Sequence, residues 1–275
     1  MSKYEDYDKI SATYDRTRRA LGVDELMKAL ARGRVPLSRQ TVLDAGCGTG
    51  NFALELRDQV GRIVCADYSL GMLNRCREKL SGGRAAEDLV RCDLAELPFR
   101  ADRFDAIMCN QSLHHLDEPG TGFPNHRRFL AHARRVLRAD GLLIINTITH
   151  EQLRDGVWWG ELIKPAVDRM TERFASVDGL KEMSAEAGFQ FLDAVVPIGA
   201  VMQPEGYLDP GSLRSADFRS GDSHFSLLTA NELEAALARL GQMESDRSIH
   251  AYISRREEAR ARLGQSIFVI AKKAG

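Results

Sequence analysis

The chain has 275 residues, a formal net charge of −1 from 38 basic and 39 acidic side chains, and 44% hydrophobic residues. The length fits one α/β domain with a substantial insertion or appendage, and the composition is that of an ordinary globular protein. The balanced charge argues against a nucleic-acid partner bound by phosphate neutralisation. No apolar run reaches the roughly 18 residues of a membrane span, and the polar amino terminus lacks the apolar core of a secretory signal.

The first elements along the chain are expected to be helices, one of them covering Val23 to Ala31 and ending before Gly33 and Pro36. From Thr41 onward, short apolar runs alternate with helical stretches. The expected strands are residues 41–45, 62–67, 88–93, 104–109 and 141–147. The expected helices are residues 51–60, 69–80, with Ser69 as N-cap, and 129–137. This alternation predicts βαβ units and a parallel sheet.

The alternation is lost after Thr149 and returns near Leu228, so residues 150–228 are predicted to be an insertion after the fifth strand. A helix is expected from its N-cap Thr229 to Gly241. Two further strands are expected at residues 249–253 and 265–271.

The strongest motif is the run Val42-Leu43-Asp44-Ala45-Gly46-Cys47-Gly48-Thr49-Gly50, where a buried strand leads into three glycines at alternate positions. Glycines allow a sharp turn and a close approach of a ligand to the backbone, and the amino terminus of the following helix presents unpaired N–H groups. The spacing is G-x-G-x-G and differs from the G-x-G-x-x-G of dinucleotide-binding proteins. The motif therefore predicts a ligand-binding loop.

Two aspartates stand where the next two strands end. Asp67 ends the second strand, where a carboxylate can accept hydrogen bonds from both hydroxyls of a ribose. Asp93 follows the third strand, where its carboxylate can accept from an adenine amino group while the Leu94 N–H donates to the ring. Because the carboxyl ends of parallel strands form the ligand-binding edge of an open α/β sheet, these residues are expected to share one site with the glycine loop.

These segments together resemble the class I S-adenosylmethionine-dependent methyltransferases, in particular the small-molecule branch that includes ubiquinone and menaquinone methyltransferases. The resemblance rests on residues 43–50, 67–73, 92–99 and 104–107, and it covers about residues 40–148 and 229–272. It implies an α/β fold with a Rossmann-like, seven-stranded, mostly parallel sheet, helices on both faces, and a lid insertion after the fifth strand. The implied domains are residues 1–38, helices that close over the cofactor; 39–149, the cofactor-binding core; 150–228, the lid; and 229–275, a closing helix and the last strands.

The resemblance also implies S-adenosylmethionine as the cofactor. Asp44 would orient its ammonium, Asp67 would hold its ribose, Tyr68 and Met72 would flank its adenine, and Asn110 would contribute a backbone carbonyl. The full set of implied cofactor-binding residues is Asp44, Gly46, Cys47, Gly48, Asp67, Tyr68, Met72, Asp93, Leu94 and Asn110.

Two residues are candidates for catalysis. His115 is the candidate general base, because histidine titrates near neutrality, and its alternative role is structural. Tyr14 in the amino-terminal segment is a candidate contact to the cofactor or the acceptor. Aromatic and polar side chains of the insertion are candidates for binding the acceptor, although the aromatic ones could instead form the insertion's own core. These candidates are Trp158, Trp159, Arg219 and His224.

No metal site is expected. The pair His114 and His115 has no further ligands at a suitable spacing, and the cysteines lack a CxxC pattern. Four of the five cysteines lie in or just after apolar runs, which favours buried, reduced thiols and a cytoplasmic location. The five are Cys47, Cys65, Cys76, Cys92 and Cys109.

The sequence thus predicts methyl transfer from S-adenosylmethionine to a small organic acceptor, at an oxygen, carbon, nitrogen or sulfur atom, with release of S-adenosylhomocysteine. Residues Asn110-Gln111-Ser112-Leu113 lack the Asn/Asp-Pro-Pro-aromatic motif of enzymes that methylate nucleic acids or protein glutamine. One alternative is a non-catalytic, cofactor-binding regulatory or scaffold protein. The other is a nicotinamide-dependent oxidoreductase, against which the glycine spacing and Asp93 speak. No oligomeric state is predicted.

Overall fold

A computed structural model describes residue 11 and residues 14–16, 18–81 and 88–275. Seven strands form one sheet in the order β3-β2-β1-β4-β5-β7-β6. Strands β1 to β5 are parallel, and β7 runs antiparallel between β5 and β6. The strands are β1 (Thr41–Ala45), β2 (Arg62–Asp67), β3 (Leu89–Arg91), β4 (Phe104–Asn110), β5 (Leu137–Thr147), β6 (Phe189–Val195) and β7 (Ile267–Lys273). The predicted Rossmann-like, mostly parallel sheet is confirmed.

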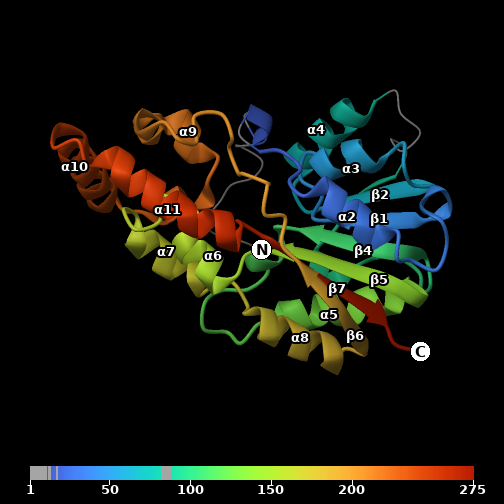
Figure 1. Cartoon of the computed structure of the whole chain (residues 1–275). Coiled ribbons are helices and arrows are strands. Elements are labelled where there is room, and N and C mark those ends of the chain that lie inside the picture. Colours follow the sequence, from blue (N-terminus) through green and yellow to red (C-terminus); the bar gives the residue numbers. More distant parts are fainter. Residues whose placement is uncertain (1–10, 12–13, 17, 82–87) are drawn as a thin grey trace.

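Helices cover both faces of this sheet (Figure 1). One hydrophobic core contains Leu143 and Ile145 of β5 and is covered by α5 (Pro124–Val136) and α8 (Val177–Glu186). The opposite core contains the alternate β5 residues Leu142 and Ile144. Its covering helices are α2 (Val23–Leu30), α3 (Asn51–Leu56) and α4 (Leu70–Leu80). The central strands are continuous apolar runs because both of their faces are buried.

A third hydrophobic core belongs to a separate layer of helices beyond one end of the sheet, which we call the lid (Figure 1). The lid is built from two segments, residues 148–176 between β5 and α8 and residues 196–266 between β6 and β7. Its helices are α6 (His150–Asp155), α7 (Lys164–Thr171), α9 (Ala216–Ser220), α10 (Ala230–Ser245) and α11 (Ile249–Leu263). The short 3-10 helices are η1 (Tyr14–Arg16), η2 (Leu37–Arg39), η3 (Leu94–Glu96), η4 (Leu113–His115), η5 (Pro210–Arg214) and η6 (Ser223–Leu227).

The lid differs from the predicted insertion in three ways. Helix α8 and strand β6 lie within residues 150–228 but belong to the sheet layer. The predicted strand at residues 249–253 is wrong, because this segment is the first turn of α11 and turns Ile249, Tyr252 and Ile253 inward at helical spacing. The helix capped by Thr229 continues past Gly241 to Ser245 and packs in the lid instead of closing the sheet.

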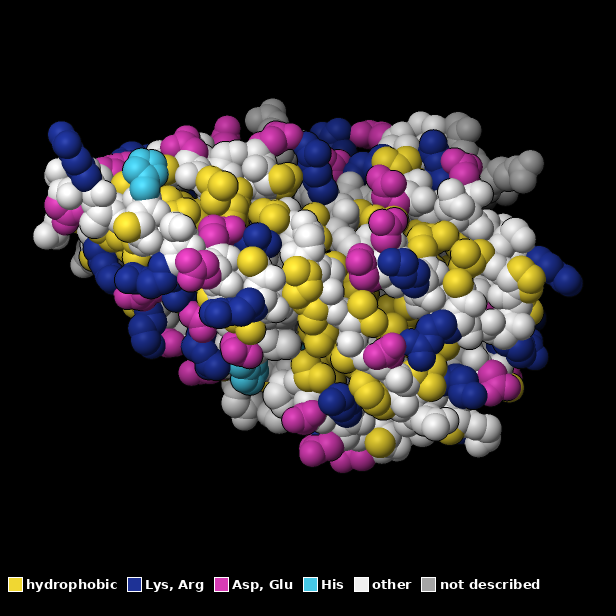
Figure 2. Space-filling model, viewed as in Figure 1, with side chains coloured by type: hydrophobic (Ala, Val, Ile, Leu, Met, Phe, Trp, Pro, Cys, Tyr) yellow, Lys and Arg dark blue, Asp and Glu magenta, His cyan; other side chains and the backbone are white. Residues whose placement is uncertain are grey.

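The helix caps that the sequence predicted at Ser69 and Thr229 are present in the structure. Ser69 caps α4 by accepting a hydrogen bond from the Met72 N–H, and Thr229 forms a capping box with Glu232. On the face shown in Figure 2, basic and acidic side chains lie interspersed over the sheet layer and the lid. Among the described residues, no helix is both long and apolar enough to cross a membrane.

Candidate active site

The glycine loop after β1 is held against the end of β2. The N–H groups of Gly46 and Cys47 both donate to the Ala66 carbonyl, at 2.7 and 3.0 Å. Gly46 has a φ of 78°, and a Cβ there would lie 2.4 Å from the Ser112 Oγ, so a larger residue is excluded. A Cβ at Gly48 would come within 4 Å of only one described side chain, Tyr14, at 3.9 Å. The loop therefore leaves open space beside Gly48.

That space is part of two adjoining cavities at the carboxyl edge of the sheet, with about 810 and 690 Å³ of empty volume. Both are lined by Tyr14, Gly46, Gly48, Asn110 and Gln111. All ten predicted cofactor-binding residues line one cavity or both. They are Asp44, Gly46, Cys47, Gly48, Asp67, Tyr68, Met72, Asp93, Leu94 and Asn110.

Asp44 is the most unusual group in these cavities. Its side chain is 1% exposed, and neither carboxylate oxygen has a hydrogen-bond partner within the described part of the chain. Both side-chain polar atoms of the neighbouring Asn110 are likewise buried and unpaired among the described residues. Burial raises the pKa of Asp44 well above its usual range, aided by repulsion from Cys76 and Asp67, while the Asn110 amide opposes the rise. Such unpaired polar groups are costly, so they point to a cationic ligand that satisfies them.

The two other aspartates are already engaged with the backbone. Asp67 accepts from the N–H groups of Gly48 and Ser69, each at 2.9 Å, and burial still raises the pKa of its carboxyl. Asp93 accepts from the Ala95 N–H at 2.9 Å and caps η3. Each carboxylate has further lone pairs for a ligand.

A third cavity, with about 460 Å³ of empty volume that includes space open to solvent, lies between Tyr14 and Arg18, the segment after β4 and the lid. It shares Tyr14, Gln111 and His115 with the second cavity, so the two adjoin. Its other lining residues are Arg18, His114, Ile148, Met170, Phe174, Met202, Asp222, Ser223 and His224. This cavity therefore offers space for a second ligand beside the residues predicted to bind the cofactor.

The predicted acceptor-binding residues divide into two groups. His224 lines the third cavity. Among the described residues, Trp158, Trp159 and Arg219 lie outside the lining of the three cavities. The two indoles are buried in the lid core, where Trp158 donates to the Tyr207 carbonyl and Trp159 to the Asp222 Oδ2. Arg219 donates to the Leu213 carbonyl at 2.7 Å. These three residues therefore support the lid instead of facing the cavity.

His115 lines the second and third cavities as expected, but its basicity is weak. Burial, with Arg18 and Arg173 nearby, lowers the pKa of His115 to about 3. Its ring lies 3.9 Å from that of His114, centroid to centroid, and His114 stacks on Phe174 at 4.3 Å. A neutral imidazole with so low a pKa is a poor general base at neutral pH. The catalytic role of His115 stays a prediction.

The sequence analysis did not single out Gln111, which lines all three cavities. It follows β4 directly and has a φ of 49° in the left-handed region. Its Nε2 donates to the Asn146 Oδ1 at 3.0 Å, and its N–H donates to the Asn146 carbonyl at 2.9 Å. Asn146 is a buried polar residue in the apolar run of β5, and that interruption was the available signal.

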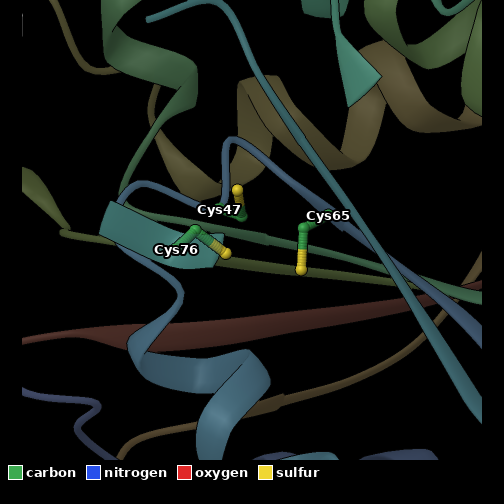
Figure 3. Close-up of side chains that lie close together, drawn as sticks. All are labelled: Cys47, Cys65 and Cys76. Carbon is green, nitrogen blue, oxygen red and sulfur yellow. The ribbon is translucent and has the colours of Figure 1, made fainter. Parts of the chain in front are cut away.

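Three cysteine side chains lie close together, from Cys47 of the glycine loop, Cys65 of β2 and Cys76 of α4 (Figure 3). The sulfur atoms of Cys47, Cys65 and Cys76 lie within 4.8 Å of one another, and all three residues are buried. Hydrogen bonds from Cys47 and Cys65, with the charges of Lys79 and Arg77, lower the pKa of Cys76 to about 4. Three sulfur donors at this spacing are also a ligand set for a thiophilic cation. The expectation of no metal therefore stays a prediction.

Comparison with known proteins agrees with this geometry. Residues 43–145 match the family described as "Methyltransferase domain". The chain is 34% identical over 142 residues to a demethylmenaquinone methyltransferase of Clavibacter sepedonicus, covering 50% of this chain and 55% of the relative. It is 31% identical over 195 residues to a malonyl-[acyl-carrier protein] O-methyltransferase of Geobacter sulfurreducens, covering 68% of this chain and 67% of the relative.

The fold of the whole chain is similar to that of a putative methyltransferase from an antibiotic biosynthesis pathway of Anabaena variabilis. The two structures share a TM-score of 0.66 at 16% identity, over 90% of this chain and 95% of the other. The sequence matches and the sheet order agree, and the chain belongs to the class I S-adenosylmethionine-dependent methyltransferases.

Proposed function

We propose that the protein transfers a methyl group from S-adenosylmethionine to a small organic acceptor in the lid cavity and releases S-adenosylhomocysteine. The observation that carries the proposal is the junction of two kinds of cavity. The first cavity, at the strand ends, is lined by Asp44, whose carboxylate has no hydrogen-bond partner among the described residues. The cavity under the lid shares Gln111 with the first cavity and both Gln111 and His115 with the second. The two relatives named above are, by their names, a demethylmenaquinone methyltransferase and a malonyl-[acyl-carrier protein] O-methyltransferase.

The lining residues fit the parts of the cofactor. Asp44 and Asn110 would receive the ammonium and its neighbouring polar groups, which would satisfy their unpaired atoms. Asp67 would accept hydrogen bonds from the ribose hydroxyls. Asp93 would accept a hydrogen bond from the adenine amino group, and the Leu94 N–H would donate one to the ring. When bound, the cofactor supplies an electrophilic methyl on a sulfonium. Residues of the chain then contribute position and the exclusion of water, the two effects on which such a displacement depends.

The amino-terminal segment is proposed to close over the cofactor. Tyr14 lines all three cavities, and Asp15 ties this segment to the core. The Asp15 carboxylate accepts from the Thr49 hydroxyl at 2.5 Å and from the Lys79 ammonium at 2.7 Å. Residues 1–10, which include part of this predicted closing segment, lie outside the described residues. The lid segments 148–176 and 196–266 would close the acceptor side.

We propose a cytoplasmic location because the cysteines are not paired in disulfides. All five lie in the described ranges, and each is a free thiol in the structure. Unpaired cysteines of this number are typical of proteins kept in a reducing compartment.

Turnover with a labelled methyl donor tests the function. Purified protein is incubated with methyl-labelled S-adenosylmethionine and fractionated metabolite extracts, and S-adenosylhomocysteine and labelled products are measured together. We expect both to appear in the same fraction and, at a subsaturating concentration of S-adenosylmethionine, to fall with Asp44→Asn. Cofactor binding without turnover in any fraction would favour the non-catalytic alternative, and binding of NAD in place of S-adenosylhomocysteine would favour the oxidoreductase.

A further inference from the structure

A buried carboxylate and a buried histidine form a hydrogen-bonded pair in the lid. The Asp222 Oδ1 lies 2.5 Å from the His224 Nδ1, and it also accepts from the His224 backbone N–H at 3.0 Å. The other oxygen, Oδ2, accepts from the Trp159 indole N–H at 3.0 Å. Three contacts thus fix the carboxylate, and the carboxylate fixes the Nδ1 edge of the imidazole. An ionised carboxylate in this place keeps the ring proton on Nδ1.

The Nε2 edge of the imidazole, opposite Asp222, has no hydrogen-bond partner among the described residues. His224 is 6% exposed, and its Nε2 is buried. Its ring lines the third cavity together with Tyr14, Arg18, His114 and His115, which are the other titratable or charged groups there besides Asp222. An unprotonated ring nitrogen can accept a hydrogen bond, and buried polar atoms normally have a partner, so a ligand in the cavity could supply the donor.

The charge on Asp222 supports this arrangement. Burial raises the pKa of the Asp222 carboxyl, but a proton on the His224 ring, the hydrogen bonds from His224 and the charge of Arg18 together hold that pKa well below its usual range. The carboxylate is therefore ionised at neutral pH, and it stabilises the imidazole once the ring has taken up a proton. Burial lowers the pKa of His114 well below its usual range and that of His115 to about 3, so both of these rings are weak proton acceptors at neutral pH.

We propose that His224, positioned by Asp222, is the general base of the reaction and that the acceptor is a hydroxyaromatic molecule methylated on its phenolic oxygen. The inference rests on the proposed function. A base is needed only where the acceptor must lose a proton. A carboxylate is already ionised at neutral pH, whereas a phenol, with a pKa of about 10, is not. The apolar side chains of Ile148, Met170 and Phe174 in the same cavity suit an aromatic ring.

The step balances without a further reagent. The phenolic O–H bond breaks, and its proton passes to the His224 Nε2. The oxygen's electron pair forms the new bond to the methyl carbon as the bond from that carbon to sulfur breaks, and the electron pair of the broken bond stays on sulfur. The imidazolium, paired with the Asp222 carboxylate, later returns its proton to water. Arg18 in the same cavity carries a positive charge that favours the phenolate oxygen.

The test uses two phenolic probes that are mostly protonated at neutral pH, 3,4-dihydroxybenzoate and menadiol, with methyl-labelled S-adenosylmethionine and the full chain. We expect the wild type to methylate at least one probe. His224→Gln should lower kcat by about 100-fold or more and change KM little, and its residual rate should rise with pH as the probe ionises in solution. His250→Gln is the matched control, since His250 is an exposed histidine on α11, and it should equal the wild type.

A second variant separates positioning from folding. Asp222→Asn should lower kcat, and ¹⁵N spectra of the His224 ring should show the loss of the Nδ1–H tautomer that the wild type displays. Calorimetry with S-adenosylhomocysteine should give the wild-type affinity for both variants. Methylation of no phenolic probe by a wild type that binds S-adenosylhomocysteine would overturn the proposal, as would wild-type kcat in His224→Gln. Failure of the wild type to bind S-adenosylhomocysteine would instead defeat the proposed function.

Discussion

Replacing Asp44 by Asn tests the cofactor site, because the two residues have nearly the same shape and differ in charge. The carboxylate is buried and has no hydrogen-bond partner within the described part of the chain, so its charge destabilises the ligand-free protein. We expect this charge to contribute favourably only when a cationic ligand is bound. A hydrogen bond to a charged group contributes about 1.5–3 kcal/mol, and every 1.4 kcal/mol is a factor of about ten in affinity. Asp44→Asn should therefore weaken S-adenosylhomocysteine binding about 10- to 100-fold.

The same substitution should not destabilise the ligand-free protein at neutral pH. Because the folded-state pKa of Asp44 is raised above that of the unfolded chain, the native state binds more protons, and its stability falls as the pH rises from the unfolded to the folded pKa. Asn carries no such penalty. We expect the free energy of unfolding of Asp44→Asn to equal or exceed that of the wild type at pH 7, with the difference shrinking as the pH is lowered.

Two measurements check this prediction. Calorimetric titration with S-adenosylhomocysteine gives the affinity, and denaturant unfolding of the ligand-free protein between pH 4 and 8 gives the stability. Asp217→Asn is the control, since Asp217 is exposed on the lid helix α9. Unchanged affinity, or a lower stability at neutral pH that persists at acidic pH, would show that Asp44 is a structural residue.

The remaining predictions concern the ribose contact, the lid core and the thiols. Asp67→Ala should lose cofactor affinity and also lower the melting temperature, because its carboxylate ties Gly48 to Ser69; an affinity loss without a thermal shift would contradict the observed contacts. Trp158→Ala should cost about 3–5 kcal/mol of lid stability and raise the rate of limited proteolysis within residues 196–266; resistance equal to the wild type would argue against a single lid core. Iodoacetamide should label the native protein slowly at pH 7, since Cys76 is buried and the pKa of each of the other four thiols is raised; rapid labelling by intact mass would refute this.

The cofactor side of the site was predictable from sequence because its residues sit at strand ends. A parallel sheet brings those ends to one edge, so finding Asp44, Asp67 and Asp93 after three apolar runs was enough to place them together. The residue types at these strand ends and the parallel order of the strands therefore led to the same prediction. Gln111 was missed because its position depends on a left-handed turn and on Asn146, a partner 35 residues away.

The lid was less predictable because its pattern depends on tertiary packing. Strand β6 lies at the edge of the sheet and is half-exposed, so its sequence lacks the continuous apolar run of the central strands. The two tryptophans were expected near the acceptor, yet a large aromatic side chain serves equally well as core, and only the fold decides. Trp159 nevertheless touches Asp222 and so bears on the proposed site indirectly.

Calorimetric titration of the full-length wild type with S-adenosylhomocysteine, beside an identical titration with NAD, tests the central claim most directly. The Asp44 carboxylate, which has no hydrogen-bond partner among the described residues, and the open space beside Gly48 predict saturable binding of one S-adenosylhomocysteine per chain. We expect no heat of binding with NAD. Absence of S-adenosylhomocysteine binding, or saturable binding of NAD in its place, would contradict the claim.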